Sequence, residues 1–317
     1  MFSNSFMSIK TLQVMPARYL FIINPIAGGI DKQLIEDFVA ERAQQEGFGY
    51  KIYKTTGTGD EKQIGQLVGD YAPKVVVVSG GDGSLLMVSR LLKNRDQLIG
   101  LFPSGSANGM AAELNIPAIK GITIAARRQS LMQCWELIKQ GRHRNIDMIK
   151  INDHYSIHLS DAGFNAQIVE GFEAEGGRGL MGYARQFVKK MTAKKKRFRY
   201  HITVEGKRRH GKAVMLAIAN ARSYGTGAII NPEGQPDDGV VELVIIKNLN
   251  MMLLLNAAAS IVTEAPGYHP DHLEVTSCRE ARIRFSKQLE LQVDGEVAGR
   301  IRQLDIEVLP GAVKLIC

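Results

Sequence analysis

The sequence predicts two globular domains, an α/β domain at residues 1–144 and a β-sandwich domain at residues 145–317. Three observations support this prediction. The chain has 317 residues, of which 45% are apolar, so it can bury more than one core. Strand and helix patterns alternate up to about residue 144, as in a parallel sheet wrapped by helices. Beyond that point strand patterns follow one another with few helices.

The elements of the first half follow from hydrophobic patterning. Short apolar runs predict strands at 19–24, 50–55, 75–78 and 98–102, and amphipathic patterns predict helices at 31–45, 60–71, 84–94, 110–114 and 127–140. The strand at 75–78 consists of four valines, and an apolar run without alternation is typical of a strand that is covered on both faces. We therefore expect a parallel sheet between two layers of helices.

The second half reads mainly as strands. Apolar and alternating runs predict them at 146–151, 155–160, 198–205, 213–219, 240–246, 281–286, 289–294 and 304–309, with helical stretches at 181–192 and 250–263. Strands at this spacing suit an antiparallel sandwich or a curled barrel. The boundary lies near residue 144, and the last strands could return to touch the first domain.

Charge and cysteine content narrow the class of partner and compartment. The 40 Lys and Arg exceed the 32 Asp and Glu, and the formal charge of +8 favours phosphates, nucleic acid or anionic lipid. Three cysteines without close pairing indicate neither a disulfide framework nor a zinc site, which favours a reducing cytoplasm. The first residues lack the apolar stretch of a signal peptide, and the longest apolar run is about half a membrane span. We expect a cytoplasmic protein that is soluble or peripheral.

Three loops rich in glycine and small polar residues follow predicted strands. They are NPIAGG at 24–29, SGGDGS at 79–84 and PSGSANG at 103–109. In open α/β sheets ligands collect at the carboxyl ends of strands, where glycines bring main-chain N–H groups close to a phosphate. One such loop could be an ordinary turn, but three together indicate a polyphosphate ligand. Neither a Walker-type lysine loop nor Gly-x-Gly-x-x-Gly after the first strand occurs, so a P-loop NTPase and an ordinary dinucleotide fold are not indicated.

Asp82 lies inside the second loop, where a bound phosphate would repel a carboxylate. Such a carboxylate is explained if it ligates Mg²⁺, acts as a general base, or does both. The alternative is that Asp82 caps the helix that follows.

The three loops, in this order and at these separations, resemble those of the diacylglycerol kinase catalytic family, which includes bacterial lipid kinases, sphingosine kinases and ceramide kinase. VDGE at 293–296 and QPDDGVVEL at 235–243 match the same pattern. The resemblance covers the chain from about Tyr19 to its end. It implies a Rossmann-like α/β domain of the kind shared with NAD kinases, then a β-sandwich domain. The active site would lie in the cleft between them and transfer the γ-phosphoryl group of ATP to a lipid hydroxyl.

The resemblance also assigns roles to residues. Asp82 and Glu296 match the catalytic carboxylates, with Asp294 beside them and Glu296 as the choice for general base. The positions that would contact the nucleotide are Asn24, Gly29, Thr55, Ser79, Gly80, Gly81, Gly83, Ser84, Leu85, Ser106 and Asn108. A structural Mg²⁺ would be held at Gln235, Asp238 and Val240, through one carboxylate and two main-chain carbonyls. The cofactors implied are ATP and Mg²⁺.

General physical chemistry leads to the same convergence. Phosphoryl transfer needs positioning, neutralisation by a cation and removal of the acceptor's proton. Asp82 from one domain and Glu296 from the other would then meet at one metal–phosphate site. The DGE sequence at 294–296 also suits a two-residue hairpin turn, a role that does not exclude the functional one.

The acceptor stays open between diacylglycerol and a related or sphingoid lipid. Bacterial diacylglycerol kinases commonly have Asn-Asp in the third loop, whereas this chain has Asn108-Gly109, which is closer to sphingosine kinases. The segment 160–170 also resembles sphingosine kinases. However, Val169 stands where those enzymes place the aspartate that recognises the substrate amine, and the adjacent Glu170 would point elsewhere.

The segment 194–212, which begins with Lys194 and ends with Lys212, holds nine Lys or Arg and one acidic residue. It would be drawn to anionic headgroups, so we expect an anionic membrane surface as a partner beside the lipid substrate. A solvated hairpin is the ordinary alternative. Phe198 and Tyr200 could stack on bases, but no known motif accompanies the charge, so nucleic acid is not an expected partner.

Two rival functions remain. An NAD kinase-like enzyme would share the Gly-Asp-Gly element, but its Asn-Glu pair has no clear counterpart here. A catalytically silent nucleotide-binding regulator could use the basic segment, but it would not need both Asp82 and Glu296. A homodimer is also left open. The sequence thus predicts a peripheral, Mg²⁺-ATP-dependent lipid kinase of the cytoplasm.

Overall fold

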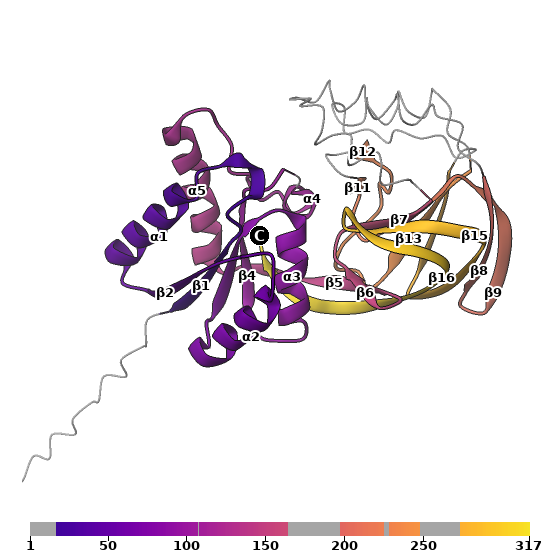
Figure 1. The fold of residues 1–317 in the computed structure, drawn as a ribbon, viewed down its shortest axis with the longest axis horizontal. Coiled ribbons are helices and arrows are strands. Elements are labelled where there is room, and N and C mark those ends of the chain that lie inside the picture. Colours follow the sequence, from indigo (N-terminus) through magenta and orange to yellow (C-terminus); the bar gives the residue numbers. More distant parts are fainter. Residues whose placement is uncertain (1–16, 107, 164–196, 225–227, 248–272) are drawn as a thin grey trace, which may run out of the picture.

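The computed structural model describes residues 17–106, 108–163, 197–224, 228–247 and 273–317. They form an α/β domain and a β domain, which lie side by side along the long axis of the molecule (Figure 1). The helices expected at 181–192 and 250–263 lie outside these residues. Within the described part of the chain, no helix is long and apolar enough to cross a membrane.

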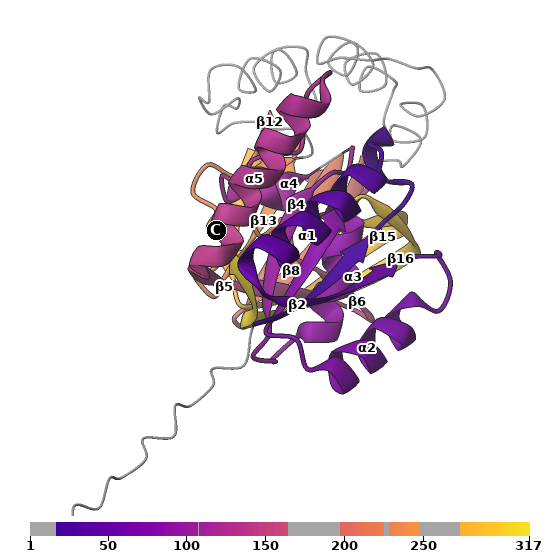
Figure 2. The same cartoon turned by 90° about the vertical axis from the view of Figure 1, so that its left-hand side faces the viewer.

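The α/β domain has a sheet of four parallel strands in the order β2-β1-β3-β4. Its elements are β1 (Arg18–Ile23), the 3-10 turn η1 (Ala27–Gly29), α1 (Gln33–Glu46), β2 (Gly49–Lys54), α2 (Asp60–Tyr71), β3 (Val75–Gly80), α3 (Asp82–Leu92), β4 (Leu98–Pro103), α4 (Gly109–Glu113) and α5 (Ile124–Gln140). Helices α1 and α5 pack together on one face of the sheet, and α2 and α3 on the other (Figure 2). Strand β3 is buried along its whole length, as its run of valines predicts.

The β domain is built from the strands that follow α5. They are β5 (His143–Ile151), β6 (His154–Ser156), β7 (Leu159–Ala162), β8 (Phe198–Val204), β9 (Lys207–Ala213), β10 (Met215–Ala219), β11 (Ser223–Tyr224), β12 (Ala228–Ile229), β13 (Val241–Ile246), β14 (Leu273–Cys278), β15 (Glu280–Val293) and β16 (Glu296–Ile316). The order β14-β13-β10-β7-β15-β16 is antiparallel, and β8 pairs with both β15 and β9. These strands enclose a second hydrophobic core.

Hydrophobic patterning predicts no strand at β9, although the alternative of a solvated hairpin at 194–212 agrees with the antiparallel pair of β8 and β9. The residues of β9 at 207–210 are all polar and exposed, because among the described strands β9 pairs with β8 alone and so lies at a sheet edge. An exposed edge strand needs no apolar alternation, and the sequence therefore carried no strand pattern there.

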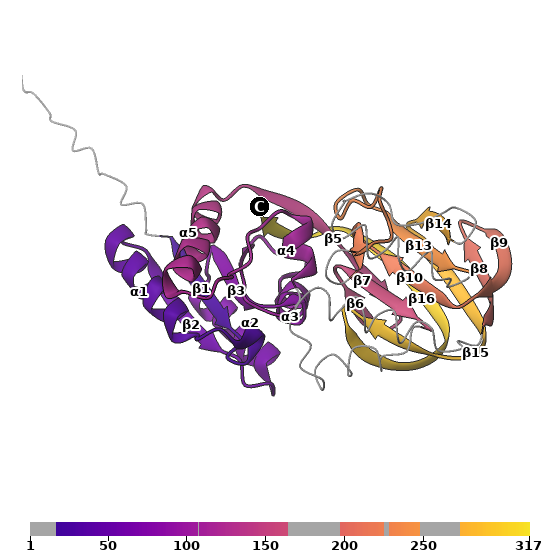
Figure 3. The same cartoon turned by 90° about the horizontal axis from the view of Figure 1, so that it is seen from above.

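Strand β16 joins the two domains. It pairs antiparallel with β15 near its start and with β5 further along, and its last residues pair in parallel with β4 through Lys314 and Leu315. Val313 and Leu315 are buried in the core of the α/β domain. The return of the last strand to the first domain is thus confirmed (Figure 3). Because one hydrogen-bonded sheet runs through both domains, the turn before β16 has a fixed place relative to the α/β domain.

Candidate active site

The three glycine-rich loops meet at the carboxyl edge of the parallel sheet. The Asn24 N–H donates to the Ser79 carbonyl oxygen at 2.9 Å. The N–H groups of Ser104 and Gly105 both donate to the Gly80 carbonyl oxygen at 3.0 Å. The second loop therefore lies between the first and the third, and main-chain hydrogen bonds hold all three together.

Close packing explains two of the glycines. A Cβ atom at Gly28 would lie 1.9 Å from the main-chain oxygen of Ser104, and one at Gly80 would lie 2.4 Å from Oγ of Ser84. Gly29 has a φ of +61°, the left-handed region that glycine adopts at no steric cost. The loops thus present a surface of main-chain atoms to which a phosphate can come close.

Two side chains predicted to contact the nucleotide also hold the loops in shape. Nδ2 of Asn24 donates to Oγ of Ser84 at 3.3 Å, which links the first loop to the second. Nδ2 of Asn108 donates to the Gly105 carbonyl oxygen at 2.9 Å, and its Oδ1 accepts from the Gly105 N–H at 3.1 Å. Asn108 therefore closes the third loop on itself.

The other predicted nucleotide positions surround this surface. The Thr55 N–H donates to the Ile23 carbonyl oxygen at 2.9 Å, which places Thr55 at the same edge of the sheet. Gly81 precedes α3, and its carbonyl oxygen accepts from the N–H of the buried Leu85 at 3.1 Å. Ser106 is exposed. Their contact with a nucleotide stays a prediction.

Lys32 is a residue of this site that the sequence analysis missed. Its Nζ donates to the Ala27 carbonyl oxygen at 2.7 Å and to Oγ of Ser104 at 3.2 Å. Oγ of Ser104 lies 3.1 Å from Oγ of Ser79, so a buried polar chain runs beneath all three loops. The Lys32 side chain is 8% exposed, and burial lowers its pKa to about 8. Lys32 belongs to no Walker-type pattern and lies at the start of the helix predicted at 31–45, where a lysine is ordinarily exposed.

Asp82 is the first residue of α3, and its carboxylate contacts the third loop. Its Oδ2 accepts from the Gly109 N–H at 2.8 Å, and its Oδ1 accepts from the Met110 N–H at 3.2 Å. Asp82 therefore caps α4 across the loops and not its own helix, which was the alternative drawn from the sequence. A carboxylate has about four acceptor positions, so Asp82 keeps the capacity to bind a cation.

Gly109, which departs from the Asn-Asp pattern of bacterial diacylglycerol kinases, has a local explanation. A Cβ atom at Gly109 would lie 2.4 Å from Cε1 of His158. His158 is buried, so its ring fills the space that a larger residue at this position would need. The ring belongs to the β domain and packs directly on the third loop of the α/β domain.

The turn between β15 and β16 brings Glu296 to the loops. Glu296 is exposed, and its Oε1 lies 3.1 Å from the position that a Cβ atom would take at Gly83. Gly83 directly follows Asp82. One carboxylate of the β domain thus lies against the second loop of the α/β domain, as the sequence analysis expected.

Asp294 holds this turn in place. Its carboxylate accepts from Oγ of Ser156 at 2.6 Å and from the three main-chain N–H groups of residues 157–159 at 2.8, 3.2 and 2.9 Å. Desolvation raises the pKa of the Asp294 carboxyl, while these hydrogen bonds act in the opposite direction. The resemblance places Asp294 among the catalytic carboxylates, and in the structure its carboxylate faces residues 156–159 beneath the turn that carries Glu296.

The loop at 235–240, where the resemblance implies a structural Mg²⁺, lies over a buried carboxylate. Asp147 accepts from two main-chain N–H groups, one of them in this loop, at 2.7 Å each. Gln235 and Asp238 are exposed, and Oδ1 of Asp238 accepts from the Val240 N–H at 3.1 Å. No three His, Cys, Asp or Glu side chains of the described residues gather as metal ligands. A cation here would therefore depend on Asp238 and main-chain carbonyls.

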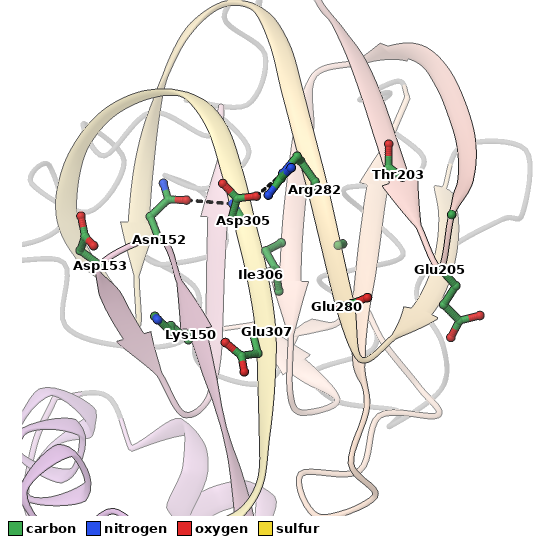
Figure 4. Close-up of a pocket in the computed structure, with 12 residues that line it drawn as sticks. Lys150, Asn152, Asp153, Thr203, Glu205, Glu280, Arg282, Asp305, Ile306 and Glu307 are labelled. Atoms are coloured by element: carbon green, nitrogen blue, oxygen red, sulfur yellow. Dashed lines mark hydrogen bonds and ion pairs between the residues drawn. The ribbon is translucent and has the colours of Figure 1, made fainter.

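A separate open pocket of about 810 Å³ lies on the β domain (Figure 4). Asp305 lies at its centre, forms an ion pair with Arg282, and donates its N–H to Oδ1 of Asn152 at 2.8 Å. None of the predicted site residues lines this pocket. Its central charged groups satisfy one another, so we assign it no role.

Two family models match the chain. The model described as the diacylglycerol kinase catalytic domain matches residues 18–151. The model described as the YegS C-terminal NAD kinase beta sandwich-like domain matches residues 161–317. The two matches together include the three loops, Glu296 and most of the described residues.

Curated relatives and solved structures agree with these models. A diacylglycerol kinase of Bacillus subtilis is 22% identical over 290 residues, which cover 90% of this chain and 91% of the relative. A probable lipid kinase YegS-like of Shewanella frigidimarina is 28% identical over 256 residues, or 76% of this chain and 75% of the relative. The crystal structure of a putative diacylglycerol kinase from Bacillus anthracis has the same fold, with a TM-score of 0.74 at 19% identity over 94% of this chain and 96% of that one.

Proposed function

We propose that this chain, which belongs to the diacylglycerol kinase family and is a lipid kinase, transfers the γ-phosphoryl group of Mg²⁺-ATP to a hydroxyl of diacylglycerol or a related or sphingoid lipid. The observation that carries the proposal is the approach of Glu296 to Gly83, where Oε1 of Glu296 lies 3.1 Å from the position that a Cβ atom would take. It brings an exposed carboxylate of one domain to the phosphate loop of the other, which is the arrangement that proton removal from an acceptor requires.

The residues divide the work of phosphoryl transfer. The glycine-rich loops would hold the triphosphate through main-chain N–H groups, and Lys32 beneath them would contribute a positive charge. Asp82 would ligate Mg²⁺, which when bound neutralises charge that develops on the transferred group. Glu296 would accept the proton of the lipid hydroxyl, and Asp294 would hold Glu296 in reach.

A lipid acceptor implies contact with a membrane, and we propose that the enzyme works at an anionic surface as a peripheral protein of the cytoplasm. The hairpin of β8 and β9 supports this, because its described residues from 197 to 212 include six Lys or Arg. Phe198 and Tyr200 point into the core of the β domain, 2% and 3% exposed, so they cannot stack on bases. The residues that bear on a sphingoid acceptor, Val169 and Glu170, lie outside the described part of the chain.

The test is a transfer assay with γ-labelled ATP and Mg²⁺ over diacylglycerol, monoacylglycerol, ceramide, sphingosine, phosphatidylglycerol and NAD, with Glu296→Gln as the paired control. A lipid that is labelled by the unchanged protein but not by Glu296→Gln would support the proposed kinase activity and identify the class of acceptor. Label on NAD alone would support the rival enzyme instead. ATP binding without any labelled product would count against the proposed transfer.

A further inference from the structure

The most exposed apolar side chains of the described residues border the candidate active site. Ile122, Ile26, Ile124 and Val297 are 100%, 88%, 66% and 54% exposed, in that order. Ile26 belongs to the first loop, and Val297 follows Glu296. Ile122 lies between α4 and α5, and Ile124 is the first residue of α5. Both belong to the segment of residues 120–124, which we call the isoleucine loop.

The isoleucine loop starts at the edge of the sheet where the phosphate loops lie. The N–H of the buried Ile119 donates to the carbonyl oxygen of Pro103 at 2.8 Å, and Pro103 is the last residue of β4. The third glycine-rich loop begins at this same proline. The loop that carries the two isoleucines is therefore anchored at the same edge of the sheet as the third glycine-rich loop.

Local contacts hold the isoleucine loop in one shape. Oγ1 of Thr123 accepts from the Ala126 N–H at 3.2 Å and so caps α5. Nε of Arg127 donates to the Gly121 carbonyl oxygen at 2.9 Å. A Cβ atom at Gly121 would lie 2.6 Å from that of Ala126, so the glycine is needed for this close approach. The exposure of the isoleucines is thus a property of an anchored loop.

Basic residues flank the isoleucine loop in the sequence, and the nearest acidic residues along the chain are Glu113 and Glu136. From residue 115 to residue 135 the sequence contains Lys120, Arg127 and Arg128 and no acidic residue. Arg128 forms an ion pair with Glu41 of α1, whereas Lys120 is exposed next to the isoleucines. Apolar side chains at a tip with basic residues at its base match the two layers of an anionic membrane surface, acyl chains below and charged headgroups above.

We propose that the isoleucine loop inserts Ile122 and Ile124 into an anionic phospholipid bilayer and so turns the rim of the active site toward the membrane. The inference rests on the proposed function in one respect, namely that the acceptor lipid resides in that bilayer. It differs from attraction to the β8–β9 hairpin, whose exposed residues at 207–210 are polar and can act only through charge. Insertion depends on apolar contact, so it should persist at high salt, where attraction between surface charges is screened.

The test is flotation of the full chain with vesicles of phosphatidylcholine that contain about 30 mol% phosphatidylglycerol, an anionic lipid. We expect the double variant Ile122→Ser and Ile124→Ser to bind about 10- to 100-fold more weakly, because burial of one isoleucine favours transfer by about tenfold. Val275→Ser is the matched control, since it changes an apolar residue of β14 that is 40% exposed. This variant should bind the vesicles as tightly as the unchanged protein does. Transfer to a water-soluble short-chain diacylglycerol should be equal in all three proteins.

Each other result has a definite meaning. Equal flotation of the double variant and the unchanged protein, or no flotation of the unchanged protein, would overturn the proposal. So would a concentration-dependent dimer that the double variant abolishes, since a second copy would then cover the loop. Loss of transfer to the short-chain lipid would show that the loop serves the active site itself. If no lipid is phosphorylated but flotation still depends on the isoleucines, the proposed acceptor fails and the membrane contact stands.

Discussion

The two sides of the candidate site are built in different ways. On the α/β side, three loops are joined by main-chain hydrogen bonds, and glycines let their backbones pack closely. On the β side, one turn presents a single exposed carboxylate, Glu296, while Asp294 holds the turn from below. The candidate binding surface therefore depends on backbone shape, whereas the candidate general base depends on one side chain and its support. Substitutions on the two sides should therefore have different kinetic signatures.

Asp82→Asn should have the largest effect, because both oxygens of the Asp82 carboxylate accept from main-chain N–H groups at the end of the third loop. An asparagine can still accept one of the two N–H groups of α4, but it loses the charge that a cation requires. We expect transfer to fall by about 1000-fold or more and the free energy of unfolding to fall by only about 1 kcal/mol. Transfer rates and urea denaturation measure the two quantities. Full activity in this variant would remove Asp82 from the reaction.

Asp294→Asn tests whether the β side depends on a supporting residue. The Asp294 carboxylate accepts four hydrogen bonds, and the amide group of asparagine would turn a donor toward donors. We expect kcat to fall by about 100-fold and the free energy of unfolding to fall by about 1–3 kcal/mol, with little change in the KM for ATP. Glu296→Gln is the control, since an exposed side chain should leave stability unchanged while kcat falls. A raised KM for ATP at unchanged kcat would contradict a positioning role on this side.

The difference between the two sides also explains what the sequence could predict. Alternation of strands and helices and the three glycine-rich loops were readable, because both follow from local periodicity and turn chemistry. The roles of Asp294 and Glu296 could not be separated, because both belong to one turn. Only the fold shows that Asp294, with a φ of +46°, directs its carboxylate to residues 156–159.

The last strand and Lys32 show two further limits. Strand β16 has 21 residues and changes register between Leu309 and Val313, so the strand predicted at 304–309 is only part of an element whose full length no short pattern reveals. Burial of Lys32 depends on its contact with Ser104, which lies 72 positions further along the chain. A lysine at the start of a helix is expected to be exposed when the loops that cover it cannot be predicted from the sequence.

Lys32 gives the α/β side a dependence on pH. Its pKa is lowered to about 8 by burial, so Lys32 is charged below that pH and neutral above it. If its charge attracts the triphosphate, the KM for ATP should rise by about tenfold as the pH increases from 7 to 9, with kcat little changed. Lys32→Met should have a high KM at all pH values. Lys54→Met, which changes an exposed lysine of β2, should keep the pH dependence of the unchanged protein.

Lys32 should also make the stability of the ATP-free protein depend on pH. Here a higher pH should be favourable, whereas it should weaken the binding of ATP. The folded pKa lies below the ordinary value of 10.5, so the unfolded chain binds more protons between about pH 8 and 10.5. The free energy of unfolding should therefore rise with pH across this window and lose that slope in Lys32→Met. Near pH 7 we expect the variant to be about 1–3 kcal/mol more stable, because it no longer buries a charge. Urea denaturation at several pH values would measure this, and a less stable variant would contradict it.

Gly83→Ala should give the smallest effect. It tests both sides of the candidate site together, because Gly83 belongs to the second loop and faces Glu296 of the β domain. Gly83 lies in the first turn of α3, where alanine favours the helix by about 0.5–1 kcal/mol. However, the new Cβ would lie 3.1 Å from Oε1 of Glu296 and push that carboxylate away. We expect a slightly more stable protein whose kcat is lowered about three- to tenfold at an unchanged KM for ATP. Gly69→Ala in α2, where no atom lies within 4 Å of the added Cβ, should raise stability alone. Equal kcat in the two variants would mean that Glu296 does not need its place against the second loop.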